Sequence, residues 1–183
     1  MTQFITAKIW SKLPLEHHYK GEPTPWVKMT RPGQSLHSFL EGPDFDTLGN
    51  LWLVDVPYGR IFKINPSGEW ELHHAYDGEP HSIKQKSDGT FILTDYKKGL
   101  LHYDGGANFK TLASEFEGRK FKGLSDLTIA PNGVGWFTDS GRRSLSDLTG
   151  NVFRFKIIFF YIINIVVRRL LKEIIFVANI SLY

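Results

Sequence analysis

Three polar residues stand at the same position of three repeated segments: Glu41, His81 and Ser125. In each segment, Gly follows this leading residue by 8 positions and Asp follows it by 14. The three offer a carboxylate, an imidazole and a hydroxyl group. The chain has no cysteine, which excludes thiol nucleophiles and zinc held by thiolates. From residue type alone, Glu41 could equally be a solvated acid at a strand start, and His81 could simply fill space.

The Asp that closes each segment has a simpler interpretation. Asp55, Asp95 and Asp139 end an apolar run in the same way in all three segments. A catalytic residue needs to occur only once, whereas a structural one recurs with the structure. We therefore expect these carboxylates to cap turns by accepting hydrogen bonds from backbone N–H groups.

The spacing of the segments indicates what must position these residues. The leading residues are 40 and then 44 positions apart, a period typical of solenoids and propellers. Turn dipeptides (Gly49-Asn50, Asp88-Gly89 and Asn132-Gly133) separate short runs rich in β-branched and aromatic residues, which is a hairpin signal. The sequence therefore predicts an all-β fold. A β-sandwich is the alternative, but it would not repeat Gly and Asp at fixed offsets.

Each unit is expected to hold four antiparallel strands, which is the anatomy of a propeller blade. The second strands are nearly all apolar, as strands buried on both faces are. The predicted second strands are 51–54, 91–94 and 136–138. The predicted third strands are 59–64, 99–103 and 150–155. Fourth strands are predicted at 70–73 and 109–112.

Three stretches resemble one known family, namely EGPDFDTLGNLWLVDVPYGRIFKI, YDGEPHSIKQKSDGTFILTDYKKGLL and FKGLSDLTIAPNGVGWFTDSG. In order and spacing they are similar to the SMP-30/gluconolactonase/luciferin-regenerating-enzyme-like family. The resemblance covers residues 36–155 and implies a partial six-bladed β-propeller of about three blades. It also implies hydrolysis of lactones, in which a divalent metal ion polarises the lactone carbonyl and activates water.

The resemblance also assigns roles to the leading residues. Glu41, in the family's EGP motif, is implied as a metal ligand. His81 replaces an Asn and is implied as a substrate contact or as filling at the channel mouth. Ser125 replaces an Asn that binds metal or substrate, and its hydroxyl is the weaker oxygen donor. Asp126 should point off the channel axis and accept hydrogen bonds from buried backbone N–H groups.

The family pattern ends at about Phe155, so the chain is expected to be truncated. The family's other metal-ligand Asn and its general-base Asp come from later blades, and the catalytic residue is therefore unknown here. Ca²⁺ is the implied cofactor, with Zn²⁺ or Mn²⁺ as alternatives. A single intact carboxylate predicts weak or absent binding, because Ca²⁺ takes 6–8 oxygen ligands. We expect a lactonase that is impaired or inactive, and a non-catalytic propeller fragment acting as a binding module is the alternative.

Three regions follow from this reading: a lead-in at 1–35, the partial propeller at 36–155 and an apolar tail at 156–183. In the tail, apolar pairs recur every four residues, which predicts an amphipathic helix. The abrupt change to an Ile- and Phe-rich composition is typical of a segment foreign to the family. Such a segment arises when a coding sequence is read past a splice site. An interfacial membrane anchor is the alternative, since the apolar run is too short to span a bilayer.

The distribution of charge and the lack of a visible targeting signal limit which partners and which location are expected. Residues 1–155 carry 18 basic and 18 acidic side chains, and the net charge of +3 comes from the tail. Nucleic-acid binding is therefore not expected, nor is membrane binding except through the tail. No signal peptide is seen, so a cytoplasmic location is expected. The expected partner is a small-molecule lactone. Self-association of the chain is also expected, through the open edges and faces of an incomplete ring.

Overall fold

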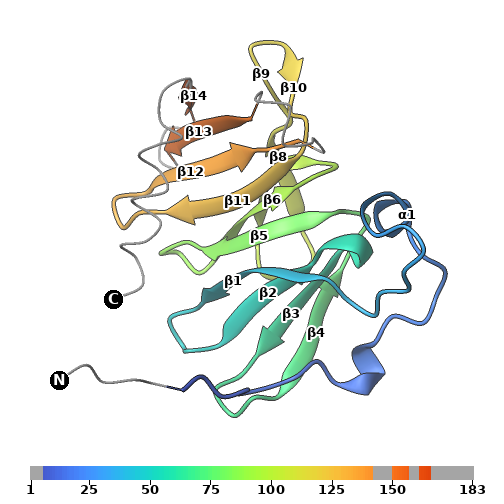
Figure 1. Cartoon of the computed structure of the whole chain (residues 1–183). Coiled ribbons are helices and arrows are strands. Elements are labelled where there is room, and N and C mark those ends of the chain that lie inside the picture. The colour runs from blue at the N-terminus through green and yellow to red at the C-terminus, as the bar shows by residue number, and fades with distance from the viewer. Residues whose placement is uncertain (1–5, 142–149, 157–160, 166–183) are drawn as a thin grey trace.

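Three four-stranded antiparallel sheets stand side by side in the computed structural model (Figure 1). The structure describes residues 6–141 and 150–156, and the backbone of 161–165. In each sheet the strands follow one another in chain order, β1-β2-β3-β4, β5-β6-β7-β8 and β11-β12-β13-β14. The three sheets meet through their first strands, because β5 contacts both β1 and β11. This is the arrangement of successive propeller blades.

The strands confirm the predicted repeat. The bounds of the first sheet are β1 (Leu40–Phe45), β2 (Leu51–Asp55), β3 (Arg60–Ile64) and β4 (Trp70–Ala75). Those of the second are β5 (Pro80–Gln85), β6 (Phe91–Asp95), β7 (Gly99–Tyr103) and β8 (Phe109–Ala113). Those of the third are β11 (Leu124–Ile129), β12 (Val134–Asp139), β13 (Asn151–Lys156) and β14 (Tyr161–Ile165).

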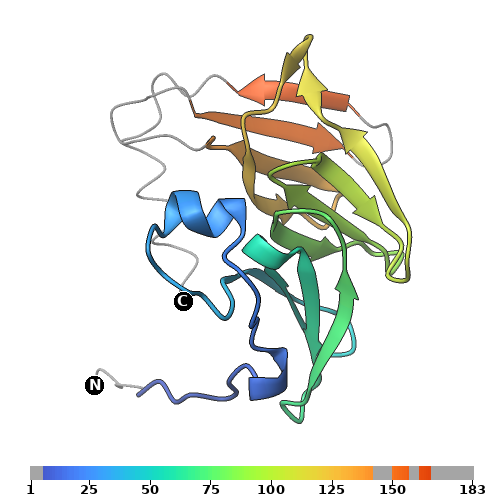
Figure 2. The ribbon, with the colours of Figure 1, turned by 90° about the vertical axis from the view of Figure 1, so that its right-hand side faces the viewer.

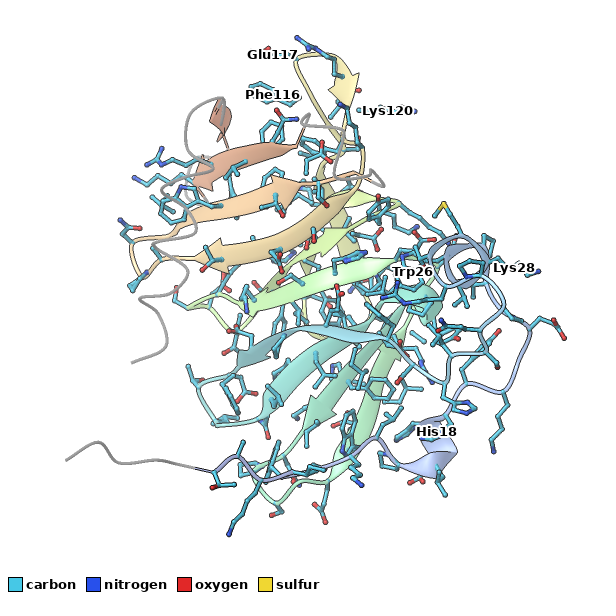
Figure 3. All side chains as sticks on the ribbon, viewed as in Figure 1. His18, Trp26, Lys28, Phe116, Glu117 and Lys120 are labelled. Carbon is cyan, nitrogen blue, oxygen red and sulfur yellow. The ribbon has the colours of Figure 1, made fainter. Side chains whose placement is uncertain are left out.

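Shorter elements join and flank the sheets. They are the 3₁₀ turns η1 (Leu15–His17) and η2 (Val56–Tyr58), the helix α1 (Pro25–Thr30), and the hairpin of β9 (Glu115–Phe116) and β10 (Arg119–Lys120). Figure 3 shows Trp26 of α1 against the body of the molecule and Lys28 pointing outwards, while Phe116, Glu117 and Lys120 lie on the projecting hairpin. No helix in the part of the chain described here is long and apolar enough to cross a membrane.

The three repeated aspartates have the predicted structural role. Each is almost completely buried and accepts a hydrogen bond from the backbone N–H of the residue 16 positions earlier, at 2.7–3.0 Å. The donors are, in order, Phe39, Glu79 and Gly123. The carboxylates thus tie the end of each second strand to the segment that enters the first strand.

Burial of these carboxylates has electrostatic consequences. Burial raises the pKa of Asp55, against the opposing effects of the Phe39 N–H and the Arg60 guanidinium. The Tyr76 hydroxyl donates to Asp95 Oδ2 at 2.7 Å. Burial, together with that carboxylate, raises the pKa of Tyr76 well above its ordinary value. The buried acids are therefore held by several donors each, as buried charges must be.

Two apolar cores hold the sheets together. Alternate residues of β2 and β3 face the second sheet, where Trp52, Val54 and Ile61 pack with Ile83 and Leu93. Between the second and third sheets, a corresponding core forms; its fully or nearly fully buried members are Ile92, Leu100, Leu124, Leu127, Phe137, Phe153 and Phe155. Strands that pack on both faces read as continuous apolar runs, which is why the second strands were recognisable in the sequence.

The other face of the first sheet is not open, contrary to the expectation for an incomplete ring. It presents Leu53, Phe62 and Ile64, and Leu13 packs against this group. The His17 ring lies 5.3 Å from that of Phe62, and its carbonyl accepts from Arg60 Nη1 at 2.7 Å. Figure 2 shows the N-terminal segment running along this side of the sheet. The lead-in therefore covers one face that was predicted to be exposed.

The prediction of a helix in the tail is wrong for residues 161–165. Lys156 ends β13, and residues 161–165 form β14, which pairs antiparallel with β13 from Val152↔Ile165 to Lys156↔Tyr161. The sequence Tyr-Ile-Ile-Asn-Ile is rich in residues with high β-propensity, and the free edge of β13 offers it a partner. The strand completes the third sheet. The rest of the predicted helix lies outside the described residues.

Candidate functional site

The three leading residues lie in the first strands, at the end where those strands begin. Each first strand has a β-bulge at this point: register shifts occur between Glu41 and Asp44, between Pro80 and Ser82, and between Leu124 and Leu127. A bulge adds an unpaired residue and re-aims side chains, and bulges are frequent next to active sites. β1, β5 and β11 adjoin across the three sheets (Figure 1). The bulges therefore form a row on neighbouring strands.

Gly42 explains how two of these strands come so close. Its φ is +59°, and a Cβ on it would lie 2.4 Å from both the carbonyl oxygen of His81 and Cα of Ser82. Real Cβ atoms do not approach backbone at that distance, so only glycine fits here. The Gly of the EGP motif therefore lets β1 approach β5 and brings its neighbour Glu41 to His81.

Glu41 and His81 are in direct contact. His81 Nδ1 lies 2.8 Å from Glu41 Oε2, although the residues are 40 positions apart. A carboxylate can only accept, so Nδ1 carries the proton and donates it. The Glu41 side chain is 35% exposed and that of His81 is 11% exposed, so the pair sits at the rim of the structure with the carboxylate on the wetter side.

The second ring nitrogen of His81 is buried. Nε2 has no hydrogen-bond partner among the described residues. The ring of Tyr96 lies beside it, with centroids 5.4 Å apart. Tyr96 in turn lies against Gly123, where a Cβ would come within 2.1 Å of the tyrosine ring. His81 is thus held by a hydrogen bond on one side and an aromatic wall on the other.

Ser125 is not brought into the same hydrogen-bonded group. Its carbonyl accepts from the Thr94 hydroxyl, which links the second sheet to the third. Among the described residues, no hydrogen bond involves the Ser125 hydroxyl. The expectation that Asp126 accepts hydrogen bonds from buried backbone N–H groups was wrong, because the residue is exposed and its own N–H donates to Thr138 Oγ1 at 3.0 Å. The register of β11 shifts at this point, between Leu124 and Leu127.

The described residues do not fit a divalent cation. No three His, Asp or Glu side chains among residues 6–141 and 150–156 are arranged to hold a metal ion. Glu41, the implied ligand, already accepts a hydrogen bond through Oε2 from His81. Ca²⁺ takes 6–8 oxygen ligands, and this site supplies one carboxylate and one hydroxyl. Its observed chemistry is that of a carboxylate–imidazole pair.

Sequence reasoning missed the supporting residues. Tyr96 follows the closing Asp of the second unit, but Val56 and Ser140 stand at that position in the others, so the repeat gave no signal. A signal existed for the threonines, since Thr94 and Thr138 both precede the closing Asp. In both cases the hydroxyl contacts the backbone of β11.

Comparisons with known proteins agree with the fold and the motif. No protein-family model matches the chain. The chain is 30% identical over 135 residues to lactonase drp35 of Staphylococcus aureus strain MW2, a match that covers 69% of this chain and 40% of that protein. It is 29% identical over 134 residues to lactonase drp35 of Staphylococcus epidermidis, with 69% and 39% covered. The chain therefore spans about 40% of the length of these relatives.

Solved structures share the fold at lower identity. A gluconolactonase from Xanthomonas campestris superposes with a TM-score of 0.62 at 16% identity, over 70% of this chain and 47% of that one. A calcium-binding protein, regucalcin, from Agrobacterium tumefaciens superposes with a TM-score of 0.58 at 19% identity, over 69% and 42%. The names of these relatives match the SMP-30/gluconolactonase/luciferin-regenerating-enzyme-like family that the repeated motif resembles, and the solved structures share the fold.

Proposed function

We propose that this chain carries part of a lactone-hydrolysing site and acts on small-molecule lactones. The observation that carries the proposal is the contact between Glu41 and His81 at the start of adjoining first strands. Support comes from the relatives, which are named lactonases and gluconolactonases. The three sheets would be blades of a six-bladed ring, with this row of bulges facing its central channel.

The metal dependence expected from the family is the weaker part of this proposal. The regucalcin neighbour is described as a calcium-binding protein. In this chain Glu41 is bonded to His81 and the described residues supply too few oxygen ligands. We therefore propose that metal-dependent hydrolysis is impaired, and that added Ca²⁺, Mn²⁺ or Zn²⁺ increases the rate little.

Acid release in a pH-stat tests the proposal. The full 183-residue chain is given aldonic and simple aliphatic lactones, with a chelator or with each of the three cations. We expect slow, saturable hydrolysis above the buffer rate for at least one lactone. Hydrolysis no faster than in buffer under all conditions would refute the proposed function and would favour a non-catalytic binding module.

A further inference from the structure

The bulge of β1 begins at Glu41 and is held only loosely by its own sheet. β1 pairs with β2 at Glu41↔Val54 and again at Asp44↔Trp52, and the register shifts between these two pairs. Pro43 lies within the shift and has no N–H to donate to a neighbouring strand. Since a bulge disrupts the ladder locally, the direction of the Glu41 side chain depends on what else fixes this backbone.

Lys84 of β5 supplies that support. Its ammonium group donates to the carbonyl oxygen of Pro43 at 2.6 Å and lies 3.4 Å from Asp44 Oδ1. The other carboxylate oxygen of Asp44 accepts from the backbone N–H of Gln85 at 3.0 Å. Hydrogen bonds in which one partner is ionised are roughly twice as strong as neutral ones. These bonds join β1 to β5, which belong to different sheets.

The Lys84–Asp44 pair belongs to the site and not to the repeat. The residue three positions after each leading residue is Asp44, Lys84 or Thr128, so the third unit offers no charge there. By contrast, the buried aspartates that every blade uses recur in all three units. Among the described residues, the charged pair joins the same two strands whose leading residues are in contact, Glu41 and His81.

We propose that Lys84 is a positioning residue for Glu41. Together with Asp44 it fixes the bulge of β1 and thereby orients the Glu41 carboxylate in the site that opens lactones. This inference rests on the proposed function. Gly42 sets the bulge from the other side, because a Cβ there would lie 2.4 Å from the His81 carbonyl oxygen. Functional side chains must be held within about 0.5 Å of their working geometry, and Lys84 supplies part of that constraint.

The first test reads the orientation of Glu41 and needs no activity. Long-range ¹H–¹⁵N spectra of the full chain identify the His81 ring by the signals that disappear in His81→Gln. These signals depend on the carboxylate 2.8 Å from Nδ1. In Lys84→Met we expect them to move towards their positions in Glu41→Ala. In Lys84→Arg they should stay close to those of the wild type, because a guanidinium can donate to both acceptors. Unchanged signals in Lys84→Met would overturn the proposal.

Lys86→Met is the matched control. Lys86 comes directly after β5, and its ammonium contacts Asp88 Oδ2 at 2.6 Å and Thr90 Oγ1 at 3.1 Å. The substitution removes the same charge from a contact within one hairpin. It should leave the His81 signals as in the wild type, and an equal shift in both variants would overturn the proposal. Urea unfolding establishes that each variant is folded under the conditions of the assay.

The second test measures hydrolysis of an aldonic lactone and a simple aliphatic lactone, with a chelator and with each of the three cations. Misplacement of a functional group by about 1 Å can cost about 100-fold in rate, so Lys84→Met should lower kcat by about 10–100-fold. KM should change less, because Lys84 acts through Glu41 and not on the lactone. Lys84→Arg should recover most of the rate, and Lys86→Met should keep it. A residue that served stability alone would leave kcat unchanged in the folded variant.

The outcomes separate this inference from the proposed function. No hydrolysis by the wild type under any condition refutes the proposed function, and the contribution of Lys84 to the rate falls with it. Displaced His81 signals in Lys84→Met would then still support the orientation of Glu41 by Lys84. Hydrolysis by the wild type that Lys84→Met leaves unchanged overturns the role of Lys84 and leaves the lactonase proposal intact.

Discussion

Replacement of Gly42 by alanine tests whether close strand approach builds the site. At φ +59°, a residue with a Cβ costs roughly 1–2 kcal/mol in backbone strain. The new Cβ would also lie 2.4 Å from backbone atoms of β5, which cannot move like a flexible side chain. Overpacking of this kind costs about 1–3 kcal/mol. The expected loss in the free energy of unfolding is therefore about 2–5 kcal/mol.

Gly89→Ala is the matched control for this prediction. Gly89 has φ +84° in a turn, and a Cβ there meets nothing within 4 Å. The Gly89→Ala variant should lose only the roughly 1–2 kcal/mol of unfolding free energy that comes from backbone strain. Urea unfolding followed by tryptophan fluorescence gives both values. In Gly42→Ala alone, the NMR signals of the His81 ring should also shift, because β1 and β5 are forced apart. Equal destabilisation of the two variants, with unchanged His81 signals, would refute the reasoning.

Further predictions concern stability. Asp95→Ala should lower the free energy of unfolding by at least about 2 kcal/mol, because three backbone N–H groups and a tyrosine hydroxyl lose their acceptor. Chemical denaturation measures this loss, and a value below about 0.5 kcal/mol would contradict the prediction. The Lys86 ammonium holds the pKa of Asp88 at about 2. The stabilisation from the ionised Asp88 carboxylate should therefore be complete above about pH 4 and be lost as the pH falls towards 2. Asp88→Asn should reduce this pH dependence of the free energy of unfolding by no more than about 1 kcal/mol, because the Asp88 side chain is exposed. Deletion of residues 1–19 should expose the outer face of the first sheet and increase ANS fluorescence and light scattering; unchanged signals would show that the lead-in does not protect that face.

Much of the fold was predictable because it repeats. The Gly and Asp at fixed offsets, the turn dipeptides and the apolar second strands located the second, third and fourth strands of the first two sheets to within two residues. The buried aspartates were recognisable as structural since all three units share them. Local patterns of this kind are consistent with the final packing, which is why they can be read without a structure.

Other features depended on contacts between distant segments. The lead-in lacks a repeat, so nothing indicated that Leu13 and His17 would cover the first sheet. The four-residue periodicity of the tail favoured a helix, but pairing with the free edge of β13 decides the backbone at 161–165. Tertiary context overrides local propensity in this way.

The site was only half predictable for the same reason. Glu41 and His81 were singled out by their shared repeat position, yet their direct hydrogen bond depends on the close approach that Gly42 permits. The resemblance implied a metal ligand at Glu41, whereas the structure places an imidazole on that carboxylate. No pattern in the sequence distinguishes these two arrangements, because both need the same residue at the same spacing.

The most direct test of the proposed function is the rate of lactone hydrolysis by the wild type and by Glu41→Ala, measured side by side with a chelator and with each added cation. We expect measurable hydrolysis by the wild type and a lower rate in the folded variant, because the contact between Glu41 and His81 carries the proposed site. Equal rates for the two proteins, or a wild-type rate no higher than that of buffer, would contradict it.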